Sequence, residues 1–209
     1  MTSPFSLIAH RREVLISAGA LALSGCASII PKPVTPQLYV LRPQMPAVMG
    51  MPVRWRLSVA APDTAASLDT ARIALTRSAT TMDYFANAAW NERIPLLFQR
   101  LLIQSFDASG RILSVDRDTS GLENDYVLET DIRDFQARYE TPDGAPQIVV
   151  GVQAKLVRMP QRQIVASLNA QQQAQAGANT LDAVVVAFNQ AAGAAIGQIV
   201  TWTLSAPAT

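Results

Sequence analysis

Apolar and polar residues alternate through much of the second half of the chain, and this period of two predicts β-strands. The clearest case is 125–139, where Tyr126, Leu128 and Ile132 fall on one face and charged residues lie between them. Segments 147–158 and 163–174 follow, joined by a short turn around Pro160. We expect these three strands to form an antiparallel meander with one solvent-exposed face.

Shorter strand-like segments precede this meander. In 53–60, Val53, Trp55, Leu57 and Val59 alternate with polar residues, which predicts a strand with one buried face. Residues 43–52 are expected to form a loop, and we assign no strand or helix to 82–91. Further strands are expected at 37–42, 72–77 and 111–116.

Two segments carry the wider spacing of helices. Residues 92–106 have an apolar stripe that includes Leu97 and Leu101, and Pro95 suits a first helical turn. Residues 179–204 form the second, with Asn179 or Thr180 as the N-cap. The order of strands and helices predicts an α/β fold: one two-layer domain with a mixed, largely antiparallel sheet and two main helices packed on it.

The second helix has two interpretations. No charged residue follows Asp182, and the small-residue run 193–197 would suit a transmembrane helix. Polar residues such as Asn189 and Gln198 argue instead for an amphipathic helix packed on the sheet, which we expect. Its weakly polar Ala/Gly face is then a candidate contact surface for a partner.

The N-terminal segment has the pattern of an export signal. Arg11 and Arg12 precede a short apolar run, 14–22, which ends at Leu23-Ser24-Gly25-Cys26. This is a bacterial lipobox, and it predicts that Cys26 is lipidated and becomes the mature N-terminus. The alternative is that Cys26 is a small buried hydrophobe. Export by the general or by the twin-arginine route remains open.

We therefore expect a signal peptide over 1–25, a lipidated Pro-rich tether over 26–36 and the α/β domain over 37–205. More than one acyl chain on Cys26 gives stable membrane anchoring. Ala27 follows the cysteine, and the absence of Asp there favours the outer membrane. The expected location is the periplasmic side of the cell envelope.

Composition limits the chemistry of the mature chain. Removing 1–25 takes away His10, the only histidine, and leaves 15 basic and 15 acidic residues. Nucleophile–histidine sites and His- or Cys-ligated zinc are excluded, no phosphate-binding glycine loop is present, and a nucleic-acid footprint is absent. We expect no catalysis, no cofactor and no metal. The acidic stretch 116–125 could hold a divalent ion, but it lacks regular ligand spacing and is expected to be a solvated loop.

Several segments resemble the ABC-type transport auxiliary lipoprotein family. The resemblance rests on the lipobox, on Tyr39-Val40-Leu41, on Asp83-Tyr84-Phe85-Ala86, on Trp90 to Pro95 and on Asp125-Tyr126-Val127-Leu128. It implies a non-catalytic auxiliary component of a mammalian-cell-entry (MCE) type transporter that moves lipids between the inner and outer membranes. The implied partners are an MCE-domain protein, a permease and an ATPase, and a homo-oligomer is possible.

Two other functions are weighed against this one. The first is a structural outer-membrane assembly lipoprotein, associated with a β-barrel or a secretion complex. The second is an enzyme that acts on envelope glycans with paired carboxylates, which no spacing in the chain requires.

Two hydrophobic features could contact a partner. Met45, Met49 and Met51 lie in the loop before the second strand; the simpler interpretation packs them over the edge of the core, and the alternative makes them an adaptable contact. Trp90 is expected to be a core residue, with a docking patch shared with Tyr84 and Phe85 as the alternative.

Overall fold

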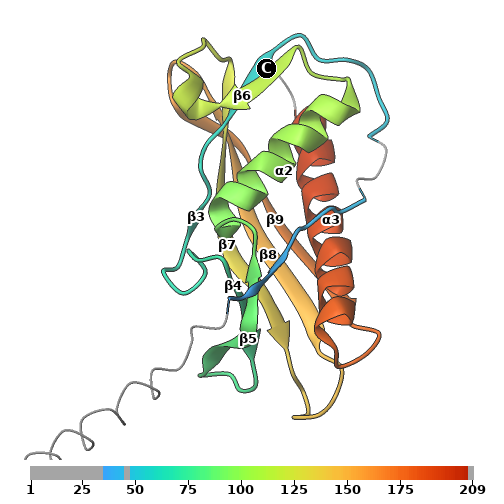
Figure 1. Ribbon diagram of the computed structural model, residues 1–209. Coiled ribbons are helices and arrows are strands. Elements are labelled where there is room, and N and C mark those ends of the chain that lie inside the picture. Colours follow the sequence, from blue (N-terminus) through green and yellow to red (C-terminus); the bar gives the residue numbers. More distant parts are fainter. Residues whose placement is uncertain (1–34, 45–47, 207–209) are drawn as a thin grey trace, which may run out of the picture. The chain divides into compact units, whose positions relative to one another are not determined.

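The computed structural model describes residues 35–44 and 48–206. One mixed sheet forms a layer, and two helices cover one of its faces (Figure 1), which confirms the predicted fold class. The helices are α2 (Ile94–Ser109) and α3 (Leu181–Ser205), with a 3-10 helix η1 (Asp118–Ser120). The strands are β1 (Gln37–Tyr39), β2 (Arg56–Val59), β3 (Asp63–Thr64), β4 (Arg72–Thr76), β5 (Met82–Trp90), β6 (Ser114–Arg117), β7 (Tyr126–Arg138), β8 (Gln147–Arg158) and β9 (Gln163–Gln175).

The sheet is organised around β7. One edge of β7 pairs with β8 along its whole length, antiparallel, and β8 pairs in the same way with β9. The other edge of β7 pairs in turn with three short parallel strands, β2, β3 and β4. The predicted meander is thus confirmed. The ladder with β2 ends at Leu128 of β7 and the ladder with β3 begins at Asp131, so the pairing along this edge is broken between the two.

Strand β5 was not expected. It pairs with β4 and β1, but its alternation is disturbed by Asn87, whose φ is 54°, and by a register shift between Arg72 and Ala74. These irregularities hide the period of two that identifies a strand. The first strand also ends earlier than expected, at Tyr39, because the chain then leaves the sheet to cross the helices.

Three aromatic side chains form the centre of the core. Trp90 packs edge-on against Phe188, with ring centroids 5.1 Å apart, and against Phe135 at 6.2 Å. Phe135 and Phe188 are stacked at 5.2 Å. The three residues come from β5, β7 and α3, so this contact joins both layers of the domain.

Helix α3 is a core helix. It is the one helix of the described part of the chain with the length and apolar character to span a membrane, but 61% of its most apolar window is buried in the domain. It begins after Thr180, whose hydroxyl accepts the Ala183 N–H at 3.4 Å. Asn179, the other candidate cap, instead accepts a hydrogen bond from the Tyr139 hydroxyl at 2.9 Å.

Residues 37–44, which we call the N-terminal strap, run from the sheet edge across the helices (Figure 1). The Tyr39 hydroxyl donates to Asp182, the Arg42 N–H donates to Asn189 at 2.7 Å, and Leu41 is fully buried. A Cβ on Gly193 would lie 2.9 Å from the Gln44 carbonyl oxygen. The small-residue run of α3 is therefore packed, at Gly193, against the chain's own strap.

One carboxylate in α2 is placed unfavourably. Slight burial raises the pKa of Asp107, and the nearby Asp116 carboxylate raises it further. Asp107 also lies in the last turn, where the helix dipole disfavours negative charge. The folded chain therefore binds this proton more tightly than the unfolded chain, so ionised Asp107 destabilises the fold above the ordinary pKa of 3.8.

We expect Asp107→Asn to raise the free energy of unfolding at pH 7 by a few tenths of a kcal/mol, since the site is mostly exposed. The gain should disappear as the pH falls below the ordinary carboxyl pKa. Urea unfolding at pH 7 and pH 3.5 measures both values, with Glu140→Gln in an exposed loop as the control. A gain that persists at low pH would exclude the electrostatic explanation.

Candidate interaction surface

The methionine loop, residues 48–52, lies at the end of the domain where β6 begins. Arg111, just before β6, holds its main chain: the guanidinium donates to the Met49 carbonyl at 2.7 Å and to the Met51 carbonyl at 3.0 and 3.2 Å. The Val53 N–H donates to the Arg111 carbonyl at 2.6 Å. The loop thus has a defined main-chain conformation.

Gly50 makes this arrangement possible. Its φ is 134°, a value that other residues rarely adopt. A Cβ at this position would lie 2.6 Å from the Arg111 guanidinium. Glycine therefore allows the loop to lie directly on the arginine.

The methionine side chains point away from the core. Met49 is 85% exposed and Met51 is 84% exposed. The expectation that they pack over the edge of the core is wrong, because Arg111 fixes the main chain while both side chains extend into solvent. Met45 lies outside the described residues. Leu113, the residue before β6, is also largely exposed, so the loop and the segment that leads into β6 both present apolar side chains to solvent.

The three aromatic residues weighed as a docking patch do not lie together. Trp90 is 1% exposed and belongs to the core, as expected, and Phe85 packs towards Tyr139 with ring centroids 6.5 Å apart. The Tyr84 ring instead lies under the Arg72 guanidinium, 3.7 Å from it, and its hydroxyl donates to a main-chain carbonyl. No shared patch therefore exists at these residues.

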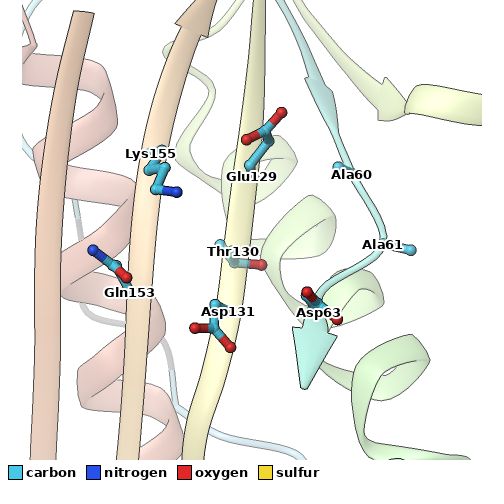
Figure 2. Close-up of a pocket in the computed structure, with 8 residues that line it drawn as sticks. All are labelled: Ala60, Ala61, Asp63, Glu129, Thr130, Asp131, Gln153 and Lys155. Atoms are coloured by element: carbon cyan, nitrogen blue, oxygen red, sulfur yellow. The ribbon is translucent and has the colours of Figure 1, made fainter. Parts of the chain in front are cut away.

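A polar pocket of about 370 Å³ lies on the sheet face opposite the helices, at the break between β2 and β3 (Figure 2). Glu129 faces Lys155 across the β7–β8 ladder, and Asp131 faces Gln153. Asp131 also accepts a hydrogen bond from Arg133 at 3.3 Å. Asp131 thus has a partner of opposite charge, and Lys155 stands opposite Glu129 in the ladder, an arrangement common on a solvent-exposed sheet face. The pocket is lined by Ala60, Ala61, Asp63, Glu129, Thr130, Asp131, Gln153 and Lys155.

The acidic stretch 116–125 has a structural role. Asp125 accepts the Arg56 N–H at 2.7 Å, and its carboxylate also contacts the Arg56 guanidinium at 3.4 Å. Glu123 lies 3.6 Å from the same guanidinium. Among the described residues, no group of three His, Cys, Asp or Glu side chains is arranged to hold a metal ion. The ion-binding alternative therefore has no support in this part of the chain.

Comparison with known proteins assigns the chain to a protein family. The family model of the ABC-type transport auxiliary lipoprotein component matches residues 39–200, which is most of the chain. The chain belongs to this family. The resemblance seen in the sequence is thereby confirmed, and the match runs from the strap to the last turns of α3. A search of curated proteins finds no match for this family member.

Solved structures share the fold of this auxiliary lipoprotein. Protein XCC0632 from Xanthomonas campestris is 26% identical, with a TM-score of 0.74, over 80% of this chain and 95% of its own. An uncharacterized protein is 15% identical, with a TM-score of 0.62, over 79% of this chain and 97% of its own. Both comparisons cover nearly the whole of the other protein.

Cys26, the residue to which the sequence assigns a modification, lies outside the described residues, as do the signal peptide and most of the tether. Its lipidation stays a prediction. Sequence reasoning overlooked Arg111 as the residue that shapes the methionine loop. The one sequence signal was Gly50 between two methionines, because glycine is the residue that adopts a positive φ most readily.

Proposed function

We propose that this protein is a non-catalytic lipoprotein, anchored through Cys26 on the periplasmic side of the envelope and favouring the outer membrane. It acts as the auxiliary component of an MCE-type ABC transporter that moves lipids between the two membranes. The observation that carries the proposal is the family match over 39–200, together with the lipobox. The MCE partner, the permease and the ATPase come from the resemblance.

Two further observations support an auxiliary role. After removal of the signal peptide, the chain has no histidine, and its only cysteine is the expected lipid attachment site. The methionine loop presents Met49 and Met51 on a main chain held by Arg111. Methionine side chains adapt to irregular partner surfaces, so this loop suits a protein contact better than a reaction.

We expect a photo-crosslinking residue at Met51 to form an adduct with an MCE-domain protein in intact envelopes. The control is the same residue at Thr80, which is exposed in the turn between β4 and β5, at the other end of the domain (Figure 1). The Met51 adduct should exceed the Thr80 adduct several-fold, as measured by mass spectrometry of the crosslinked bands.

Crosslinks to other proteins would change the proposed function. A β-barrel protein crosslinked at Met51 would select the outer-membrane assembly function. Equal adduct yields at Met51 and Thr80 would remove the methionine loop from the contact. Repeated absence of any MCE-domain protein from both positions would count against the transporter itself.

A further inference from the structure

The polar pocket of Figure 2 lies where the pairing along one edge of β7 is broken, between Leu128 and Asp131. Its volume of about 370 Å³ is many times that of one water molecule. Pockets that hold small molecules have volumes of this order. The break is therefore large enough to take a small organic group from the face of the sheet that the helices leave uncovered.

Three carboxylate side chains line this pocket. Asp63 of β3 lies directly opposite Asp131 of β7 in a parallel ladder, so their Cα atoms are separated by about the 4.8 Å spacing of neighbouring strands. Glu129 is two residues before Asp131 and projects from the same face of β7. Like charges directly opposite each other in a sheet are destabilising. A positive charge between the two strands would offset this repulsion.

The basic residues near the pocket neutralise the carboxylates only in part. Arg133 contacts the Asp131 carboxylate at 3.3 Å. Lys155 stands opposite Glu129 in the β7–β8 ladder, but within the described residues these two side chains form no ion pair. Three acidic and two basic side chains leave a net charge of −1. A ligand with one positive charge therefore balances the pocket.

A buried hydroxyl beside the carboxylates also lacks a partner. Thr130 lines the pocket between Glu129 and Asp131 and is 5% exposed, and its Oγ1 atom makes no hydrogen bond within the described part of the chain. Figure 2 shows this oxygen on the side of β7 that faces Ala61 and Asp63. Buried polar groups are nearly always hydrogen-bonded, and an unpaired one is destabilising. The pocket thus combines surplus negative charge with an unused hydrogen-bonding group.

We propose that the polar pocket binds a primary ammonium group, carried either by a small organic amine or by a lipid headgroup. The ammonium lies between β3 and β7, near the carboxylates of Asp63 and Glu129, and donates a hydrogen bond to Thr130 Oγ1. An ammonium has three N–H donors and no acceptor, which suits carboxylate oxygens and an unpaired hydroxyl oxygen. This inference rests on the pocket alone and is independent of the transporter assignment.

Other ligands fit the pocket less well. Among the described residues, no group of three His, Cys, Asp or Glu side chains is arranged to hold a metal ion. An anion would be repelled by the carboxylates. A quaternary ammonium has the required charge, but it has no N–H group to pair with Thr130. The difference between a primary and a quaternary ammonium therefore tests the proposal.

Ethanolamine and choline are a matched pair of probes, because methyl groups replace the ammonium hydrogens in choline. We would titrate each probe, and Ca²⁺ alone, into the full chain in detergent at neutral pH and follow the ¹H–¹⁵N NMR signals of residues 129–131. Ethanolamine should shift these signals with a dissociation constant about tenfold lower than that of choline. Unchanged signals, or equal constants for the two probes, would overturn the proposal. Ca²⁺ that bound at these signals more tightly than ethanolamine would indicate a metal site and overturn it as well.

Two variants separate the hydroxyl from the charge. Thr130→Val keeps the shape of the side chain, so it should weaken ethanolamine binding about tenfold and leave choline binding unchanged. Asp63→Asn should weaken the binding of both probes several-fold. Asp143→Asn, in the exposed turn between β7 and β8, is the control and should change neither constant.

Thermal unfolding shows whether each variant is folded. A Thr130→Val protein that lost affinity for both probes equally would contradict the hydrogen bond. An Asp63→Asn protein that bound as the Asp143→Asn control does would contradict the site. Should Thr130→Val not fold, the exposed Asp63 position decides.

Lipid nanodiscs distinguish the two sources of the ammonium. The same NMR signals are compared for the full chain in nanodiscs of phosphatidylcholine alone and in nanodiscs of equal parts phosphatidylcholine and phosphatidylethanolamine. A shift that requires phosphatidylethanolamine would support a lipid headgroup as the ligand and would link the pocket to the proposed lipid transport. Signals that respond to ethanolamine but to neither nanodisc would support a free amine, and the pocket would then have a role outside that transport.

Discussion

Cys26→Ala is expected to release the protein from the membrane while the domain remains folded. Each buried CH₂ of an acyl chain contributes about 0.8 kcal/mol to anchoring, so losing more than one chain lowers membrane partitioning by at least about a hundredfold. The uncut signal does not replace the anchor, because its apolar run, 14–22, has nine residues and a bilayer-spanning helix needs about 20.

Fractionation of envelopes and mass spectrometry of the N-terminal peptide measure this effect. Ala27→Ser, which leaves the lipobox intact, is the matched control and should stay acylated and membrane-bound. Circular dichroism should give the same thermal transition for both variants. A Cys26→Ala protein that still sedimented with membranes in the absence of partners would show that another segment provides the attachment.

Trp90→Ala is expected to have the largest effect on stability. The side chain is 1% exposed and contacts Phe188 and Phe135, which come from different layers. Truncating a buried large aromatic side chain costs about 3–5 kcal/mol. For a domain of this size, that loss lowers the melting temperature by about 10 °C.

Two further variants separate packing from hydrogen bonding. The Trp90 Nε1–H has no hydrogen-bond partner among the described residues, so Trp90→Phe removes no hydrogen bond and should cost only about 1 kcal/mol. Trp202→Ala, at a partly buried site on α3, should cost less than Trp90→Ala. Urea unfolding provides all three values. Equal losses for Trp90→Ala and Trp202→Ala would contradict a central role for the aromatic cluster.

The elements with long, regular alternation were predictable from local sequence. β7, β8 and β9 begin and end within one residue of their expected limits. Pro95 lies in the first turn of α2 as predicted, although the helix runs from Ile94 to Ser109 where 92–106 was expected. Thr180, one of the two candidate caps, precedes α3. In β7, burial of one face enforces alternation along most of the strand, so several positions carry the same information. β8 is buried along most of its length and was recognised as an apolar segment next to a turn.

The parallel pairing of β2, β3 and β4 with β7 was not predictable in the same way. It depends on contacts between residues far apart in the chain, such as Leu57 with Tyr126 and Ala74 with Gln136. The local periodicity of the sequence does not indicate which strands lie side by side. β5 was missed because Asn87 breaks its alternation, and β3 is only two residues long.

The conformation of the methionine loop could not be predicted from the sequence for a different reason. The composition of the methionine loop suggested both burial and exposure, and the choice depends on Arg111, about sixty residues away along the chain. A single arginine that fixes a distant main chain leaves no periodic signal. The buried role of Trp90, by contrast, follows from its size and its place before an apolar helix.

The N-terminal strap has a mechanical consequence for any protein held by its N-terminus. A pull on the tether enters the domain at Gln37, and β1 is the first element to receive it. There the force acts on a short parallel ladder with β5, then on the buried Leu41 side chain of the strap and on the Arg42–Asn189 hydrogen bond. Tension on the anchor would therefore detach the strap before the force reached β7, β8 or β9. The strap would thereby protect these three strands from forces on the anchor.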